Sequence, residues 1–243
     1  MRYLITFSYD GSCFNGYQRQ NKLKTIQGEI EKVLTDVNDG KKVEIYSSGR
    51  TDKGVHALNQ KAHFDLDVNI KLYGLKKILN KKLNGEIYIK DVCVVDNDFH
   101  ARYFVKKKIY SYYINTLEFD PIRKDYCYQY CDKLNISKMK KTSKYLIGEH
   151  DFRSFCKEEK DKENCIREIY NISINDVNGI VKITLVGNGF LRKMVRNIVG
   201  ELIEVGNGKK DIKYIKELID SKGEIHNKKS VPACGLYLDD VTY

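Results

Sequence analysis

The chain has 243 residues, of which 42% are hydrophobic, and its 43 lysines and arginines exceed its 33 acidic residues to give a formal charge of +10. This length allows one large domain or two smaller ones, and we expect two. The charge favours a polyanionic partner such as nucleic acid, and without an apolar run of membrane-spanning length a transmembrane protein is excluded.

The cysteine pattern gives no support to a disulfide-rich or zinc-binding class. Seven cysteines are scattered without a C-x-x-C pair, and the close pair Cys127 and Cys131 lacks a second pair at zinc-ligand spacing. We therefore expect reduced thiols, no metal and a cytoplasmic protein. The N-terminal residues begin an alternating strand and do not resemble a signal peptide.

Hydrophobic periodicity predicts an α/β unit in the first part of the chain. Tyr3, Ile5, Phe7 and Tyr9 share one face of a first strand, and Thr25 is a suitable N-cap for the helix that follows. The remaining elements expected here are a helix at 26–37, strands at 43–46 and 61–67, a helix at 75–83 and a strand at 87–94.

A second unit of similar design is predicted after residue 104. Tyr110 and Tyr112 lie on one face of a strand behind three lysines, and Asn178-Gly179 is typical of a hairpin turn. The other elements expected are helices at 136–147, 191–202 and 212–219, and strands at 166–174, 180–186 and 235–238. Since the order is not strictly βαβ, it favours two α/β halves with antiparallel or mixed sheets, helices on one side and a cleft between the halves.

The loop at 47–57 is the leading candidate for a functional site. It lies between two strand-like runs and places Arg50 and Asp52 between Gly49 and Gly54, which permit positive φ or close approach to a ligand. An ordinary solvated turn is the alternative, because glycine and aspartate are common in turns for backbone reasons alone.

Other residues have both a functional and a structural interpretation. Arg192 and Arg196 are four apart in the predicted helix 191–202, so they are expected on one face, either as a solvated surface or with Arg196 paired to a carboxylate. Tyr110 and Tyr112 are suited to base stacking or to simple packing.

The histidines and the absent motifs narrow the chemistry further. His56 and His63 are expected to have structural or hydrogen-bonding roles. No Walker loop, G-x-G-x-x-G, G-x-S-x-G or H-E-x-x-H motif occurs in the sequence, so most cofactor and hydrolase classes lose support.

Taken in order, a set of motifs along nearly the whole chain resembles the tRNA pseudouridine synthase A (TruA) family. GRTDKGVHA together with MVRNIVG at this separation is the most specific part of the match. The full set is YDGSCFNGYQRQ from Tyr9, GRTDKGVHA from Gly49, FHARY from Phe99, IYSYYI from Ile109, GEHDFRSF from Gly148, GFLRKMVRNIVG from Gly189 and GLYL from Gly235.

The resemblance implies a fold, an activity and a set of partners. The fold is the α+β pseudouridine synthase fold, with two similar halves at 1–104 and 105–243 joined across a basic cleft. The activity is isomerisation of uridine to pseudouridine at positions 38, 39 and 40 of the tRNA anticodon stem-loop. The family acts as a homodimer and needs neither a metal nor an organic cofactor.

The resemblance also implies roles for individual residues. By likeness Asp52 is the catalytic aspartate, Tyr110 packs against the target base and Arg196 pairs with the aspartate. Arg50 is similar to a loop arginine that assists nucleotide extrusion, and Leu236 to an apolar residue of the pocket.

Some positions differ from the family pattern and leave alternatives open. Tyr17 stands where tryptophan is common, Lys53 where alanine is frequent, and the charged segment 157–164 has no clear family pattern. These differences concern substrate range more than catalysis. The alternatives are the same chemistry on another RNA, such as ribosomal RNA, and a non-catalytic RNA-binding module.

Overall fold

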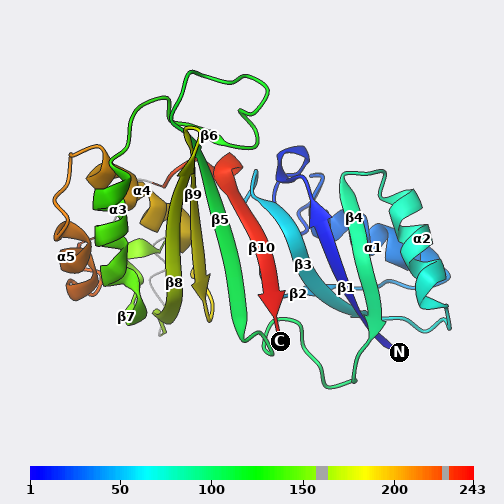
Figure 1. The fold of residues 1–243 in the computed structure, drawn as a ribbon. Coiled ribbons are helices and arrows are strands. Elements are labelled where there is room, and N and C mark those ends of the chain that lie inside the picture. The colour runs from blue at the N-terminus through cyan, green and yellow to red at the C-terminus, as the bar shows by residue number, and fades with distance from the viewer. Residues whose placement is uncertain (157–163, 226–229) are drawn as a thin grey trace. The chain divides into compact units, whose positions relative to one another are not determined.

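The computed structural model describes residues 1–156, 164–225 and 230–243. It is divided into two compact units, the first with residues 1–106 and 237–243 and the second with residues 107–236 (Figure 1). Both units combine strands with helices, which confirms the α+β class with two similar halves. The predicted charged segment 157–164 lies outside the described residues except for Asn164.

The sheet of the first unit is mainly antiparallel. Its strand order is β4 (Ile87–Val94), β1 (Arg2–Tyr9), β3 (His56–Asp65) and β10 (Leu236–Thr242), and the short β2 (Tyr46–Ser47) also pairs with β3. β1 is antiparallel to β3 and β4, whereas β10 is parallel to β3, with Tyr237 beside His56. The predicted alternation in the first strand is confirmed, since Tyr3, Ile5 and Phe7 are completely buried.

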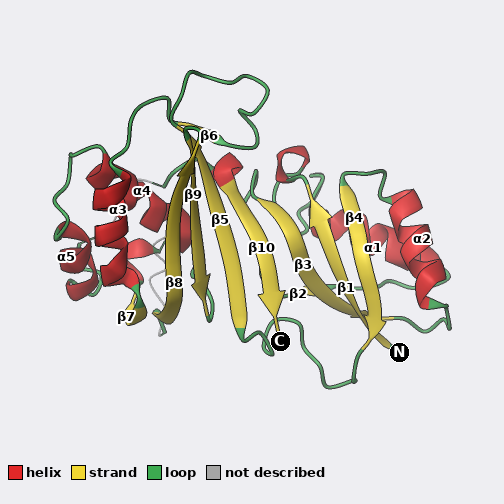
Figure 2. Cartoon of the chain, in the orientation of Figure 1, coloured by secondary structure: helices red, strands yellow, loops and turns green. Residues whose placement is uncertain are grey.

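The helices of the first unit lie along one face of its sheet (Figure 2). α1 (Ile26–Val37) has the predicted N-cap, because the Thr25 side chain accepts a hydrogen bond from Gly28 N. α2 (Leu72–Lys82) buries Leu75 and Leu79, which are one turn apart. A short 3-10 turn, η1 (Gly11–Cys13), follows β1 and was not predicted.

The sheet of the second unit is also mainly antiparallel. Its order is β5 (Lys107–Asn115), β9 (Ile180–Gly187), β8 (Ile166–Val177) and β7 (Gly148–Asp151), with the short β6 (Tyr128–Gln129) paired to β5. The predicted hairpin between β8 and β9 is confirmed, because Asn178 and Gly179 have φ of 52° and 77°. Two consecutive residues with positive φ give a turn that matches the twist of the strands.

The second unit buries its helices against one face of the sheet (Figure 2). The helices are α3 (Ile136–Ser143), α4 (Met194–Gly206) and α5 (Tyr214–Asp220), with 3-10 turns η2 (Lys144–Leu146), η3 (Arg153–Phe155) and η4 (Ala233–Gly235). α3 and α4 pack closely, because a Cβ at Gly206 would lie 2.8 Å from the Met139 sulfur. α4 is buried on nearly all sides, which explains its continuous apolar sequence.

One expectation about local backbone was wrong. Arg192 does not share a helix face with Arg196, because Lys193 adopts a left-handed conformation with φ of 64° and α4 begins only at Met194. In the candidate loop, Gly54 has a positive φ of 80°, but Gly49 does not adopt one.

Membrane and metal features were also sought within the described part of the chain. None of its helices has the length and apolar character needed to span a membrane. The same residues contain no group of three or more histidine, cysteine or acidic side chains suited to hold a metal ion.

Candidate active site

Two buried hydrogen bonds hold the candidate loop where it leaves β2. Ser48 Oγ donates to Gln60 Oε1 at 2.6 Å, and Gln60 Nε2 donates to the Gly49 carbonyl at 3.0 Å. Ser48 and Gln60 are almost completely buried, so these bonds are protected from competition by water. The first residues of the loop are thereby tied to β3.

Thr51, directly before Asp52, is held from two directions. Its Oγ1 lies 2.8 Å from the Tyr9 hydroxyl, and its carbonyl accepts a hydrogen bond from Tyr17 N at 3.0 Å. Burial raises the pKa of Tyr9 to about 12, so this phenol stays protonated near neutral pH. Both partners come from the first motif, YDGSCFNGYQRQ.

The second half of the loop packs against glycines of the same motif. A Cβ at Gly11 would lie 2.1 Å from the Val55 carbonyl oxygen, so no larger residue fits without a backbone shift. Gly54 N donates to the Gly11 carbonyl at 3.3 Å. Gly16 has a φ of 95° and faces Lys53 N. The two motifs that are far apart in sequence therefore form one packed unit.

His56 ends the loop and has the hydrogen-bonding role expected for it. Gly11 N donates to His56 Nδ1 at 3.1 Å, and the imidazole stacks on Tyr237 with 4.6 Å between ring centroids. Asp10 Oδ1 also lies 3.3 Å from Nδ1. Since Nδ1 already accepts from Gly11, it carries no proton here, and Asp10 accepts instead from Ser12 N and Oγ at 2.9 and 2.6 Å.

Asp52 lies at the bend of the loop between these two anchored halves. Its side chain is half-buried, its carbonyl accepts from Val55 N at 3.2 Å, and the nearby Arg50 is exposed. Backbone on both sides of the carboxylate is fixed by buried contacts. The loop can therefore present Asp52 in a defined position, which is a requirement for catalysis by a single side chain.

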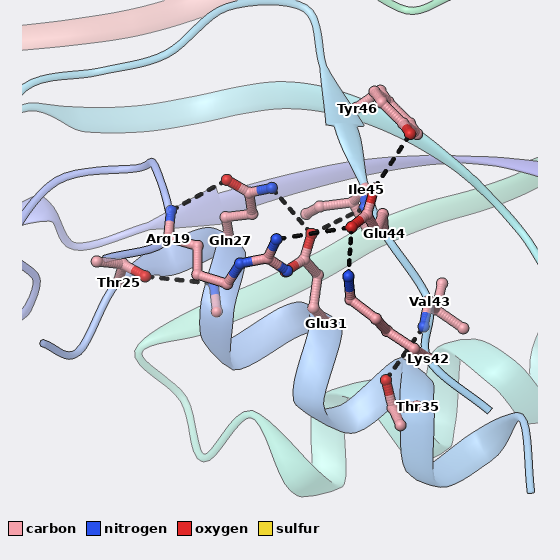
Figure 3. Close-up of polar contacts among 11 residues, drawn as sticks. Arg19, Thr25, Gln27, Glu31, Thr35, Lys42, Val43, Glu44, Ile45 and Tyr46 are labelled. Carbon is pink, nitrogen blue, oxygen red and sulfur yellow. Dashed lines mark hydrogen bonds and ion pairs between the residues drawn. The ribbon is translucent and has the colours of Figure 1, made fainter. Parts of the chain in front are cut away.

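A buried carboxylate on α1 holds the segment that precedes the candidate loop (Figure 3). Glu31 is 5% exposed, and its Oε2 accepts from Arg19 Nη1 at 2.5 Å. Its Oε1 accepts from Gln27 Nε2 at 2.8 Å and from Ile45 N at 3.1 Å. Glu31 thus connects the end of the first motif to the segment that leads into the candidate loop.

In the second unit, Tyr110 lies in the middle of β5. It pairs with Leu185 on β9, is 9% exposed and contacts the Phe190 ring edge-on at 5.3 Å between centroids. Phe190 belongs to the GFLRKMVRNIVG motif. Tyr110 is therefore held in one orientation by its own strand and by the turn before α4.

Arg196 lies in the first turn of α4 and binds the backbone of a distant segment. Its Nε donates to the Val231 carbonyl at 2.8 Å, and Val231 N lies 3.5 Å from the Arg196 carbonyl. The next residue, Asn197, donates to the Phe155 carbonyl at 2.8 Å. These contacts fix both the arginine and the chain that leads to Leu236.

Tyr112 anchors the same segment to β5. Its hydroxyl donates to the Pro232 carbonyl at 2.7 Å, and burial raises its pKa. A Cβ at Gly235 would lie 2.8 Å from the Tyr112 ring. Leu236 follows and is 6% exposed. Segment 231–235 therefore connects Arg196, the Tyr110 strand and Leu236 within the second unit.

The predicted site residues fall into two groups. Arg50 and Asp52 share the loop of the first unit. In the second unit, Arg196 binds segment 231–235, which leads into Leu236, whereas Tyr110 lies on β5 beside Phe190. The supporting residues Gln60, Glu31 and Tyr112 were not singled out for these roles. These three residues could have been found only by knowing that their polar groups are buried, and hydrophobic periodicity carries no such information.

Comparison with known proteins identifies the family. A family model described as tRNA pseudouridine synthase matches residues 5–104 and 142–243. A Bacillus cereus protein named tRNA pseudouridine synthase A 2 is 42% identical over 243 residues, covering 99% of each chain. Proteins named tRNA pseudouridine synthase A from Geobacillus sp. and Caldicellulosiruptor bescii are each 40% identical, covering 99–100% of this chain and 98% of theirs. The chain belongs to the tRNA pseudouridine synthase A (TruA) family.

Proposed function

We propose that this chain isomerises uridines 38, 39 and 40 of the tRNA anticodon stem-loop to pseudouridine, with Asp52 as the catalytic residue. The tRNA pseudouridine synthase activity is that of the family, and the choice of uridines is the finer part of the proposal. The observation that carries the residue assignment is the anchoring of the Asp52 loop. Buried contacts from Tyr9, Gly11 and Gln60 fix it on both sides.

The chemistry sets the demands on the site. The bond from C1′ to N1 of uracil breaks, a bond from C1′ to C5 forms, and the proton on C5 is lost while N1 gains one. A base within a stem or a stacked loop is out of reach, so it must first be extruded, which costs a few kcal/mol. The detached ring must then turn without escaping, which favours a closed apolar pocket.

The other predicted residues are assigned to these demands. In this proposal Asp52 is the catalytic carboxylate in its ionised form, and Arg196 stabilises its negative charge. Tyr110 and Leu236 pack against the uracil ring. Arg50, which is exposed, assists extrusion of the nucleotide. The proposal requires groups from both units to act on one uridine.

The proposal includes a homodimer, which rests on the family resemblance, and a cytoplasmic location, which rests on the cysteine pattern. The formal charge of +10 supports a polyanionic substrate. If phosphate contacts dominate, the logarithm of affinity should fall with the logarithm of salt concentration by about 0.9 or less per neutralised phosphate.

An in vitro assay tests the role of Asp52. A tRNA transcript labelled with tritium at C5 of uridine releases tritium when pseudouridine forms. Asp52→Asn should abolish release while tRNA binding stays close to that of the natural chain. Asp67→Asn removes a surface carboxylate, paired with Lys41, and should leave release unchanged. Full activity of Asp52→Asn would refute the catalytic role.

A further inference from the structure

Four aromatic rings of the first unit form a connected array that reaches its surface. Tyr46 stacks on His63 with 5.2 Å between centroids and 21° between planes. His100 meets His63 edge-on at 4.7 Å, and Tyr103 stacks on His100 at 4.3 Å and 29°. We call these four residues the aromatic array. None of them belongs to the set assigned to uridine isomerisation.

Backbone hydrogen bonds hold the two imidazoles of the array in place. Ala101 N donates to His63 Nδ1 at 3.1 Å, and Arg102 N donates to His100 Nδ1 at 3.1 Å. A ring nitrogen that accepts a hydrogen bond carries no proton, so both imidazoles are neutral in this arrangement. Burial lowers the pKa of His63 to about 4 and also lowers that of His100. The array is therefore an uncharged aromatic surface near neutral pH.

The array runs from the interior to the solvent. His63 is 2% exposed, whereas Tyr46 is 47% exposed and Tyr103 is 77% exposed. Tyr103 is thus supported through its stack on His100 while most of the ring contacts water. Holding a large aromatic ring in this way reduces the entropy lost when another flat group stacks on it. Such a platform suits a planar ligand.

Charges around the array nearly balance. Arg102 is exposed beside Tyr103, whereas Arg2 is bound to Asp65 through Nε at 2.9 Å and Nη2 at 2.8 Å. The negative charge of Asp98 also attracts Arg2 and contributes to the raised pKa of that guanidinium. A site whose charges cancel gains little from phosphate attraction, so its affinity must come mainly from stacking. Unpaired nucleobases stack on exposed aromatic rings whatever their sequence.

Tyr46 of the array directly precedes the loop, but the part of the loop that carries Asp52 lies toward the other end of β3. Thr51 bonds Tyr9, which pairs with Ala57, whereas Tyr46 pairs with His63. Six residues of antiparallel strand separate Ala57 from His63, which corresponds to roughly 20 Å. A base at the array is therefore not the uridine beside Asp52.

We propose that the aromatic array is a second RNA contact, at which Tyr103 stacks on an unpaired base of the tRNA other than the uridine being isomerised. This inference rests on the proposed function, because it requires tRNA as the substrate. It assigns a binding role to the FHARY motif, which the isomerisation chemistry leaves unused.

Fluorescence tests the contact directly, because the chain contains no tryptophan. Tyr103→Trp introduces a single indole at the array, and Tyr73→Trp introduces one on α2, where the native ring is 78% exposed. Adding an unmodified tRNA transcript should quench Tyr103→Trp and leave Tyr73→Trp unchanged. An emission from Tyr103→Trp that does not respond to bound tRNA overturns the proposal.

Binding measurements separate stacking from a merely structural role. Tyr103→Ala should weaken tRNA affinity about fivefold or more, whereas Tyr103→Phe, which keeps the ring, should stay within about twofold. The matched control Tyr73→Ala should bind as the natural chain does. The dependence on salt should be the same in all three, because no phosphate contact is removed. Equal affinities for Tyr103→Ala and Tyr103→Phe contradict the stacking role.

Two further outcomes are decisive. If Tyr103→Ala changes the oligomeric state in sedimentation experiments, the array is a contact between protein chains and the RNA proposal fails. If tRNA quenches Tyr103→Trp but the natural chain forms no pseudouridine, the proposed function fails while the stacking site stands. Pseudouridine formation with no effect at Tyr103 refutes the stacking site alone.

Discussion

The Asp52 loop of the first unit and segment 231–235 of the second are both irregular, yet they are held in different ways. The loop rests on backbone, with Gly11 against the Val55 carbonyl and Tyr17 N bonded to Thr51. The segment is gripped by long side chains, namely Arg196 Nε on Val231 and the Tyr112 hydroxyl on Pro232. The loop therefore tolerates little change in backbone at Gly11, whereas the segment also depends on two polar side-chain atoms.

The largest effect is expected from Gly11→Ala. The new Cβ would overlap the Val55 carbonyl oxygen, so the loop or η1 must shift. We expect a loss of about 3 kcal/mol in the free energy of unfolding, near the upper end for overpacking, and loss of isomerisation. Urea unfolding and tritium release measure the two effects.

Gly74→Ala is the matched control for this substitution. Gly74 lies inside α2, and a Cβ there meets only Ile70 at 4.0 Å. It should stabilise the chain by about 0.5–1 kcal/mol through helix propensity. Equal effects of the two substitutions would contradict the tight packing assigned to the loop.

Acid should weaken the first unit through His63. Its pKa is about 4 in the folded chain against 6.5 when unfolded, so the unfolded state binds the extra proton between these values. The contribution of the neutral His63 ring to the free energy of unfolding is fully present above pH 6.5. It is lost as pH falls from 6.5 to 4, by roughly 3 kcal/mol at most. His63→Gln should reduce this slope in urea titrations at several pH values. An unchanged slope in His63→Gln contradicts the burial argument.

Removing the hydroxyl of Tyr112 tests the grip on segment 231–235. Tyr112→Phe leaves the Pro232 carbonyl without its 2.7 Å donor. The expected loss is about 1–2 kcal/mol in unfolding free energy, together with reduced tritium release. Calorimetry and the release assay report it. A fully stable and active variant would show that Gly235 and Arg196 hold the segment without Tyr112.

The smallest effect contrasts two buried phenols beneath the Asp52 loop. Tyr9 bonds Thr51 at 2.8 Å, whereas the buried Tyr17 hydroxyl lies near Ser47 without a hydrogen bond of comparable geometry within the described residues. Tyr9→Phe should lower stability by about 1 kcal/mol, and Tyr17→Phe should leave it unchanged or raise it by about 1 kcal/mol. Thermal unfolding of the pair decides the sign. Destabilisation by Tyr17→Phe would reveal a partner for that hydroxyl.

Much of the fold follows from local patterns in the sequence. Alternation of Tyr3, Ile5 and Phe7, the Thr25 cap and the Asn178-Gly179 turn each depend on neighbouring residues, and each is confirmed. The start of α4 does not follow from local patterns, because lysine is not a residue type that indicates a left-handed conformation. The helical pattern therefore extended three residues too far and put Arg192 on a face that it does not occupy.

The candidate site is less accessible to local reasoning. Motifs indicated the Asp52 loop, but the contact between Gly11 and Val55 joins positions 44 residues apart. The return of β10 to β3 is similarly a tertiary event that hydrophobic alternation does not reveal. The roles of Asp52, Tyr110 and Arg196 stay predictions, because they describe contacts with a substrate.

A pseudouridine map of total RNA tests the central claim most directly. Cells lacking this chain would be complemented with the natural sequence or with Asp52→Asn, and each uridine would be scored. We predict that pseudouridine at tRNA positions 38, 39 and 40 is lost in the deletion, restored by the natural chain and not restored by Asp52→Asn. Restoration by Asp52→Asn, or losses confined to ribosomal RNA, would contradict the account.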